Sequence, residues 1–140
     1  MKGQALLVIM MLGVAGCVTT NATMLGTAAK RTALSPDSVA IYRTAAQVPG
    51  KYEEVALLNS KGPATMTNEP GMFESMKQKA AEVGANAIIL DSISEPSAGA
   101  KIAGAFLGYA PERQGKAIAI YVFPEPPAPV PTAMPVSQSP

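Results

Sequence analysis

The side chains that could carry out acid–base or nucleophilic chemistry are few in this chain. Its 140 residues include no histidine, one cysteine and ten carboxylates. Histidine is the only side chain whose ordinary pKa lies between pH 5 and 8, and it is the commonest metal ligand. A bond-breaking site would therefore depend on carboxylates, lysine, tyrosine or serine alone. The carboxylates are scattered, so the sequence predicts no metal site and no cofactor.

Three carboxylates, the adjacent Glu53 and Glu54 and the single Asp91, are the candidates for such chemistry. Glu53 and Glu54 are adjacent in a predicted strand, where neighbouring side chains point to opposite faces. They cannot reach one substrate atom together, and we expect a solvated pair. Asp91 lies in a largely apolar segment and is the best single candidate for a carboxyl with a shifted pKa. The alternative, which we favour, places Asp91 at a strand end, facing solvent or paired with Lys116 on a neighbouring strand.

The single cysteine, Cys17, follows an N-terminal segment with the layout of a secretory signal peptide. Residues 1–2 supply positive charge, residues 5–14 are apolar apart from one glycine, and residues 15–16 are small. The apolar run has about half of the ~20 residues that a transmembrane helix needs, so export is favoured over a permanent helical anchor. An unpaired thiol is unfavourable in an exported protein, which indicates a modified cysteine.

Residues 14–17, with the sequence VAGC, resemble the lipobox of bacterial lipoproteins. The resemblance implies cleavage between Gly16 and Cys17, attachment of diacylglycerol to the sulfur, and in many bacteria acylation of the new amine. Two or three acyl chains hold a protein stably, because each buried methylene contributes ~0.8 kcal/mol. Val18 replaces the aspartate that retains enteric lipoproteins in the inner membrane, so the resemblance implies an outer-membrane location. The alternative is an ordinary signal peptide that happens to contain a cysteine.

Composition excludes several classes of function. Once Lys2 leaves with the signal peptide, ten of the 11 basic residues remain against ten acidic ones. Nucleic-acid binding needs a clustered basic face, so we expect no nucleic-acid partner. Tryptophan is absent and aromatic residues make up 5% of the chain, which argues against a stacking surface for sugars or bases. Without a second cysteine, the folded part depends on apolar burial rather than disulfides.

The composition divides the chain into four parts: a signal peptide (1–16), a lipidated cysteine with a tether (17–35), a small α/β domain (36–123) and a disordered Pro-rich tail (124–140). The tether is rich in Thr, Ala and Asn without sustained periodicity, and its Lys30 and Arg31 are expected to be solvated. The tail holds seven of the 13 prolines. A domain of this size buries only ~60% or slightly more of its unfolded surface, so we expect marginal stability or self-association.

Hydrophobic periodicity predicts four strands and one helix in the order ββαββ. The predicted strands cover residues 38–44, 52–59, 87–93 and 116–123. Apolar residues at 3.6-residue spacing over 72–83 predict a helix of about four turns, with Thr67 or Asn68 as N-cap and Gly84 at a left-handed C-terminal position. The last strand is apolar on both faces, so it is either central or covered by something outside the domain. The expected fold is α+β, a small, mainly antiparallel sheet with one packed helix.

Residues 79–89, with the sequence KAAEVGANAII, carry a family resemblance. They resemble the helix-to-strand junction of a small bacterial α/β domain, found in the outer-membrane lipoprotein sensor of the Rcs envelope-stress phosphorelay and in small oligomeric proteins described as heavy-metal binders. The resemblance covers residues 39–122. This chain lacks the domain cysteines of the Rcs sensor, and its Pro-rich segment follows the domain instead of preceding it.

The junction also has a physical explanation that is independent of the family. Gly84 can end a helix at positive φ, and Ala85 and Ala87 are small enough for helix and strand to pass closely. Asn86 can form hydrogen bonds with nearby loop backbone. These roles determine a fold and not a reaction.

Residues 94–115 would be an unusually long connection between the last two strands, which predicts a functional, mobile or locally helical segment. Small residues recur there at near four-residue spacing around the bulky Phe106, namely Gly99, Ala103, Gly104 and Gly108. As a helix, the segment would present a smooth stripe for packing against a membrane or a second helix. As a loop, it would close a flexible hairpin. Both alternatives stay open at this point.

Two hypotheses of function follow. The first is a non-enzymatic outer-membrane lipoprotein whose domain binds another envelope protein or itself, or senses stress at the membrane. The second is a periplasmic ligand-binding or hydrolytic domain that uses Asp91, Tyr109 or Arg113 around the 94–115 segment. A concave polar pocket with converging groups would favour the second. We take the first as the prediction from sequence.

Overall fold

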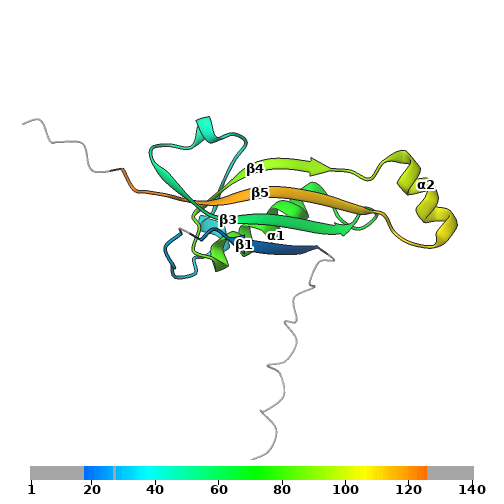
Figure 1. Cartoon of the computed structure of the whole chain (residues 1–140), viewed down its shortest axis with the longest axis horizontal. Coiled ribbons are helices and arrows are strands. Elements are labelled where there is room, and N and C mark those ends of the chain that lie inside the picture. The colour runs from blue at the N-terminus through cyan, green and yellow to red at the C-terminus, as the bar shows by residue number, and fades with distance from the viewer. Residues whose placement is uncertain (1–17, 27, 126–140) are drawn as a thin grey trace, which may run out of the picture.

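The computed structural model describes residues 18–26 and 28–125, which form an α+β fold on one five-stranded sheet (Figure 1). The strands in this part of the chain are β1 (Thr19–Met24), β2 (Ala40–Tyr42), β3 (Tyr52–Pro63), β4 (Ala87–Ser94) and β5 (Glu112–Val122). They are accompanied by the helices α1 (Glu69–Glu82) and α2 (Ala98–Leu107) and by two 3-10 turns, η1 (Pro36–Ser38) and η2 (Ala45–Gln47). The predicted α+β class is confirmed.

The strand order is β1-β3-β5-β4-β2, with β5 in the centre. Three of the four pairings are antiparallel, and the short β2 pairs parallel with β4. The longest pairing joins β3 to β5, from Tyr52 opposite Val122 to Pro63 opposite Glu112. A central place for the last strand agrees with its apolar residues on both faces, because each face packs against other parts of the domain.

The prediction of four strands was wrong, because β1 lies inside the range 17–35 that was expected to be a tether. Its only buried position is Thr20, whose hydroxyl bonds to Ser60 Oγ on β3 at 3.1 Å and lies 2.7 Å from Ser75 Oγ on α1. Polar contacts therefore fix this strand, and hydrophobic periodicity cannot detect them. The strand expected at 38–44 is also shorter than predicted, since η1 occupies its beginning.

Helix α1 forms as its sequence predicts and covers one face of the sheet. Asn68 is its N-cap, with Oδ1 accepting a hydrogen bond from Gly71 N at 2.8 Å. Met72 and Met76 are fully buried against the sheet. Their methyl groups occupy the space above Gly115 of β5, where an added Cβ would lie 2.6 Å from Met76 Cε. The helix and the central strand thus pack closely at this glycine.

The opposite face of the sheet is covered at one end by the loop that contains η2. Val48 of this loop joins Ala87, Ile89 and Ile120 in a second buried cluster. Figure 1 shows this loop standing above the sheet, near the end of β5. The loop around Val48 therefore covers part of the second face of β5, so this cover comes from within the domain.

Several predictions concern residues outside the described part of the chain. These are the signal peptide (1–16), the lipidated Cys17 and residues 126–140 of the Pro-rich tail. Among the residues that the structure describes, no helix is both long and apolar enough to cross a membrane.

Candidate functional sites at the two ends of the sheet

Helix α2 projects from the end of the sheet where β4 finishes and β5 begins (Figure 1). Ser97 is its N-cap, with Oγ accepting a hydrogen bond from Ala100 N at 3.2 Å. Gly108 ends the helix in the left-handed conformation, with φ at 75°. The prediction of a single helix was therefore wrong, because caps at both ends stabilise a helix inside the 94–115 segment.

The small residues of α2 divide between two sides of the helix. Gly104 is buried, and a Cβ there would lie 2.6 Å from the carbonyl oxygen of Tyr109. Ala103 is half-buried, while Gly99 has open space around it. Phe106 is 86% exposed. The expected small-residue stripe therefore packs in part against the returning chain of the same segment, and the bulky residues face outward.

Glu95 links the base of α2 to the sheet through two cations. Its carboxylate lies 2.5 Å from Arg113 Nη2 on β5 and 3.5 Å from Lys101 Nζ on α2. Arg113 also donates from Nη1 to the carbonyl oxygen of Thr67 at 2.7 Å, and its side chain is 14% exposed. These bonds tie α2, β5 and the start of α1 into one unit.

A cavity of about 600 Å³ lies beneath α2, lined in part by Glu95, Lys101, Tyr109 and Arg113. Tyr109 and Arg113, two of the three residues proposed for a ligand-binding or hydrolytic site, thus lie at one cavity. The third, Asp91, is exposed at a β-bulge, between the register pairs Leu90–Ala117 and Ser92–Lys116. No cluster of three or more His, Cys, Asp or Glu side chains that could hold a metal ion occurs among residues 18–26 and 28–125.

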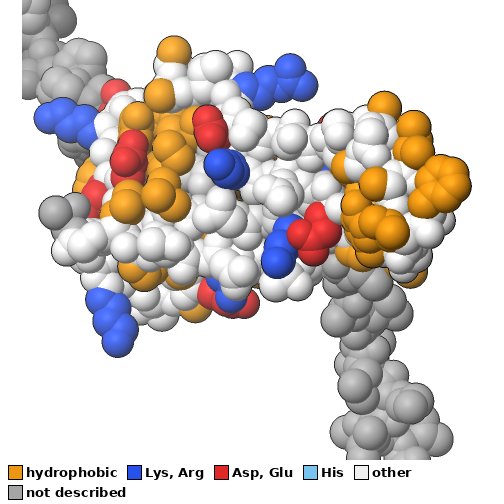
Figure 2. Space-filling model, turned by 45° about the vertical axis from the view of Figure 1, so that its right-hand side comes forward, with side chains coloured by type: hydrophobic (Ala, Val, Ile, Leu, Met, Phe, Trp, Pro, Cys, Tyr) orange, Lys and Arg blue, Asp and Glu red, His pale blue; other side chains and the backbone are white. Residues whose placement is uncertain are grey.

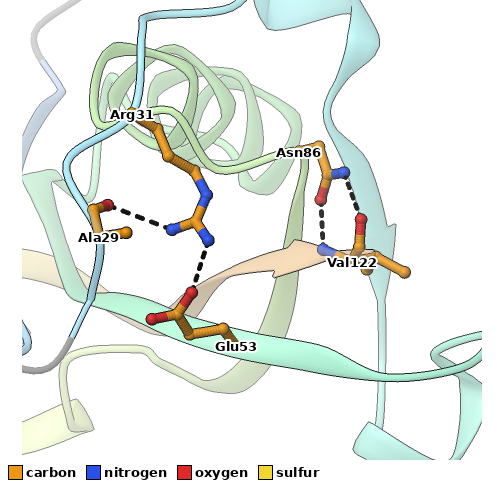
Figure 3. A network of polar contacts seen from close by, with 5 residues as sticks. All are labelled: Ala29, Arg31, Glu53, Asn86 and Val122. Carbon is orange, nitrogen blue, oxygen red and sulfur yellow. Dashed lines mark hydrogen bonds and ion pairs between the residues drawn. The ribbon is translucent and has the colours of Figure 1, made fainter. Parts of the chain in front are cut away.

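The other end of the sheet carries a second polar network (Figure 3). Arg31 donates from Nη2 to Glu53 Oε2 at 2.5 Å and from Nη1 to the carbonyl oxygen of Ala29 at 3.2 Å. Its guanidinium also lies 4.3 Å from the centre of the Tyr121 ring, within the range of a cation–π interaction. The side chains of Arg31 and Glu53 are 16% and 28% exposed. The expectation that Arg31 and Glu53 would be solvated was wrong. The two side chains pair with each other across 22 residues of sequence, and such a long-range contact leaves no local pattern.

The KAAEVGANAII junction holds this network in place. Gly84 has φ at 78°, as its predicted C-terminal position requires, and a Cβ there would overlap Arg31 Cβ and lie 2.9 Å from Thr32 O. Asn86 donates from Nδ2 to Val122 O at 2.9 Å and accepts from Val122 N at 2.7 Å (Figure 3). Asn86 therefore pairs with the end of the central strand, and not with loop backbone as expected.

We expect acid to remove the contribution of Glu53 to stability. The hydrogen bond from Arg31 lowers the pKa of this carboxyl below its usual 4.5. Stabilisation from a lowered folded-state pKa is present above the unfolded-state value and is lost as the pH falls through the folded-state value. The stability gap between the natural chain and Glu53→Gln, measured by urea unfolding, should therefore close as the pH falls below 4.5. The neighbouring Glu54→Gln serves as control, and an unchanged Glu53→Gln gap in acid would contradict the expectation.

The described fold defines a small α+β domain, with one helix packed across a mainly antiparallel sheet. Its architecture is similar to that in the crystal structure of a Francisella virulence factor, FvfA, with a TM-score of 0.50 and 14% sequence identity. The similarity covers 73% of this chain and 96% of that chain, and at this identity it concerns the fold alone. No protein-family model and no curated protein matches the sequence. The resemblance to the Rcs sensor and to the heavy-metal-binding proteins stays a prediction.

Proposed function

We propose that this chain is a non-enzymatic lipoprotein of the bacterial outer membrane, anchored through lipid on Cys17. Its small α+β domain faces the periplasm and mediates protein interaction or stress sensing there. The proposal combines the signal-peptide pattern of residues 1–16, the lipobox-like VAGC sequence and the architecture of the domain.

The observation that carries the proposal is the start of the fold at Thr19, two residues after Cys17. Thr19 pairs with Lys61 of β3, and Thr20 is buried between β3 and α1. Cleavage before Cys17 would therefore remove no part of the described structure. A signal peptide that ends directly before the folded domain is compatible with a domain anchored through Cys17.

The polar networks support an interaction protein over an enzyme. Arg31 with Glu53, and Arg113 with Glu95, use their charges to join elements of the fold. The hydrolytic or ligand-binding alternative rests on the cavity beneath α2, where Tyr109 and Arg113 lie together. A ligand there would have to compete with Glu95 for the two cations that already bind it.

The test is Cys17→Ser in the full-length chain, expressed in a Gram-negative bacterium. The natural chain should be cleaved before residue 17, carry the mass of attached acyl chains and fractionate with the outer membrane. Cys17→Ser should stay unprocessed and leave that fraction, because a hydroxyl cannot form the thioether. Thr19→Ser keeps the cysteine and controls for expression. Unchanged processing and fractionation of Cys17→Ser would refute lipid anchoring.

Crosslinking in intact cells tests the interaction part of the proposal. A specific crosslinked partner, or a dimer of this chain, is the expected result. A chain that stays monomeric at high concentration and yields no crosslinked species would count against an interaction role.

A further inference from the structure

We propose that α2 lies on the lipid bilayer and inserts Ile102, Phe106 and Leu107 into the interface between headgroups and acyl chains. The inference rests on the proposed lipid anchor at Cys17 and adds a second membrane contact to it. Three observations support the inference: the exposure of these side chains, the position of α2 relative to the start of β1 at Thr19, and the charges beside the helix.

The outer side of α2 is an exposed apolar surface. Ile102 is 60% exposed, Phe106 86% and Leu107 75%. Ile102 and Phe106 are four residues apart and therefore share one side of the helix. Figure 2 shows hydrophobic side chains gathered over the end of the molecule that carries α2. Ten residues of helix cannot cross a bilayer, but a helix with an exposed apolar side can lie in its interface.

The strand register brings the start of the fold to the same end of the molecule as α2. Thr19 of β1 lies opposite Lys61 of β3, and Lys61 lies opposite Gln114 of β5. Neighbouring strands are ~4.8 Å apart, so Thr19 is about 10 Å from Gln114. Gln114 in turn pairs with Ser94, and α2 connects these two strand ends.

Covalent geometry then limits where the lipid can be. Two residues of extended chain span at most about 7 Å, so Cys17 cannot be farther than that from Thr19. A lipid on Cys17 would therefore enter the bilayer at the end of the sheet that carries α2. A protein held at this point can bring the exposed side chains of α2 to the membrane surface.

The charges beside α2 are compatible with this contact. The sequence of α2 contains no acidic residue, and its single cation is Lys101. Glu95, at the base of the helix, is bound by Lys101 and Arg113, so its charge is compensated. Glu112 shares a shallow depression with Lys61 and Lys116. The end that would meet the headgroups thus carries no group of uncompensated carboxylates among the described residues.

The rigid base of α2 holds its apolar side away from the sheet. Gly104 packs directly on the Tyr109 carbonyl and on Pro111, which leaves no room for the helix to rotate inward. A second copy of the chain is a less suitable cover. The outer side of ten helical residues measures about 15 by 10 Å, or about 150 Å². A stable protein interface buries about 800 Å² on each partner, so this surface alone is too small for a stable dimer.

Phe106→Trp tests the contact, because the chain has no tryptophan of its own and the indole would be the single fluorophore of its kind. The vesicles consist of phosphatidylethanolamine and phosphatidylglycerol, with or without phosphatidylcholine brominated in its acyl chains. In one arm, the full chain is purified from bacterial membranes and reconstituted. In the other, residues 17–140, which retain every described residue, are coupled through Cys17 to a maleimide phospholipid. Phe123→Trp, 45% exposed at the opposite end of β5, is the matched control.

The expected result in both arms is a blue shift of the Phe106→Trp emission and loss of about half its intensity to brominated lipid, because indole favours the membrane interface. Phe123→Trp should change little. Adding Ile102→Asn and Leu107→Asn to Phe106→Trp should abolish most of the quenching, and these exposed sites leave the fold intact by circular dichroism.

The two arms separate this inference from the proposed function. Quenching only in the chemically coupled arm would support the contact of α2 with lipid, while refuting lipidation of Cys17 in the cell. No quenching in the coupled arm would overturn the contact, whatever the reconstituted chain does. A blue shift without quenching would also overturn it, because a protein surface or a second copy would then cover α2.

Discussion

Replacing Gly84 with alanine is expected to destabilise the domain by about 2–4 kcal/mol, a large share of the ~5–15 kcal/mol that holds a typical domain folded. Two effects add. An alanine at φ of 78° costs about 1 kcal/mol relative to glycine. The new Cβ would also overlap Arg31 Cβ and press on Thr32 O, and overpacking of this kind costs ~1–3 kcal/mol.

Gly50→Ala is the matched control for this prediction. Gly50 has φ at 73°, close to that of Gly84, but an added Cβ there meets nothing within 4 Å. Gly50→Ala should therefore show only the conformational cost of about 1 kcal/mol. Urea unfolding of both variants separates the close approach of residues 31–32 from the backbone effect. Equal losses in the two variants would refute a structural role for the contact with Arg31.

Asn86→Ala is expected to cost about 2 kcal/mol. The amide forms two hydrogen bonds with the backbone of Val122, at 2.9 and 2.7 Å, and each such bond contributes about 1 kcal/mol net. Removal of the Asn86 amide leaves the backbone N–H and C=O of Val122, at the end of β5, without these hydrogen-bond partners. The exposed Asn59→Ala on β3 should stay within about 0.5 kcal/mol of the natural chain.

Asn86→Asp provides a second, pH-dependent readout of the same pair of bonds. An ionised aspartate still accepts from Val122 N but cannot donate to Val122 O. A protonated aspartic acid can donate, so the deficit of Asn86→Asp should shrink as the pH falls through the titration of its carboxyl. A deficit independent of pH, or a loss in Asn86→Ala no larger than in Asn59→Ala, would show that the pairing contributes little.

The elements that depend on apolar burial could be predicted from the sequence. Helix α1 follows the predicted 3.6-residue spacing, and its N-cap is Asn68, one of the two predicted candidates. Apolar residues on both faces of 116–123 predicted a strand that is either central or covered from outside the domain, and the position of β5 in the middle of the sheet confirms the first alternative. In both cases a single physical pattern, large apolar side chains at regular spacing, determines the element and its neighbours.

The elements that depend on long-range polar contacts could not be predicted in this way. β1 has Thr20 as its buried position, and that hydroxyl finds partners 40 and 55 residues away. Arg31 meets Glu53, 22 residues away, in a fold where residues 31–32 pack against Gly84 at the end of α1. The caps of α2, Ser97 and Gly108, are visible in the sequence, but equally suit a turn. Such contacts leave no periodic pattern in one sequence.

If Cys17 carries lipid as proposed, the start of β1 at Thr19 also limits how far the domain can extend from the membrane. With lipid on Cys17, the linker between the lipid and β1 would be too short to let the domain move away from the membrane. A partner would then have to bind the domain close to the membrane surface. The length of β3, 12 residues, would then determine the distance between the membrane and the far end of the domain. Glu53 lies eight residues before Lys61, the partner of Thr19, and at ~3.4 Å per residue this separation would place the Arg31–Glu53 pair up to about 27 Å farther from the headgroups than Thr19. That distance would set the height at which a soluble partner could meet this pair.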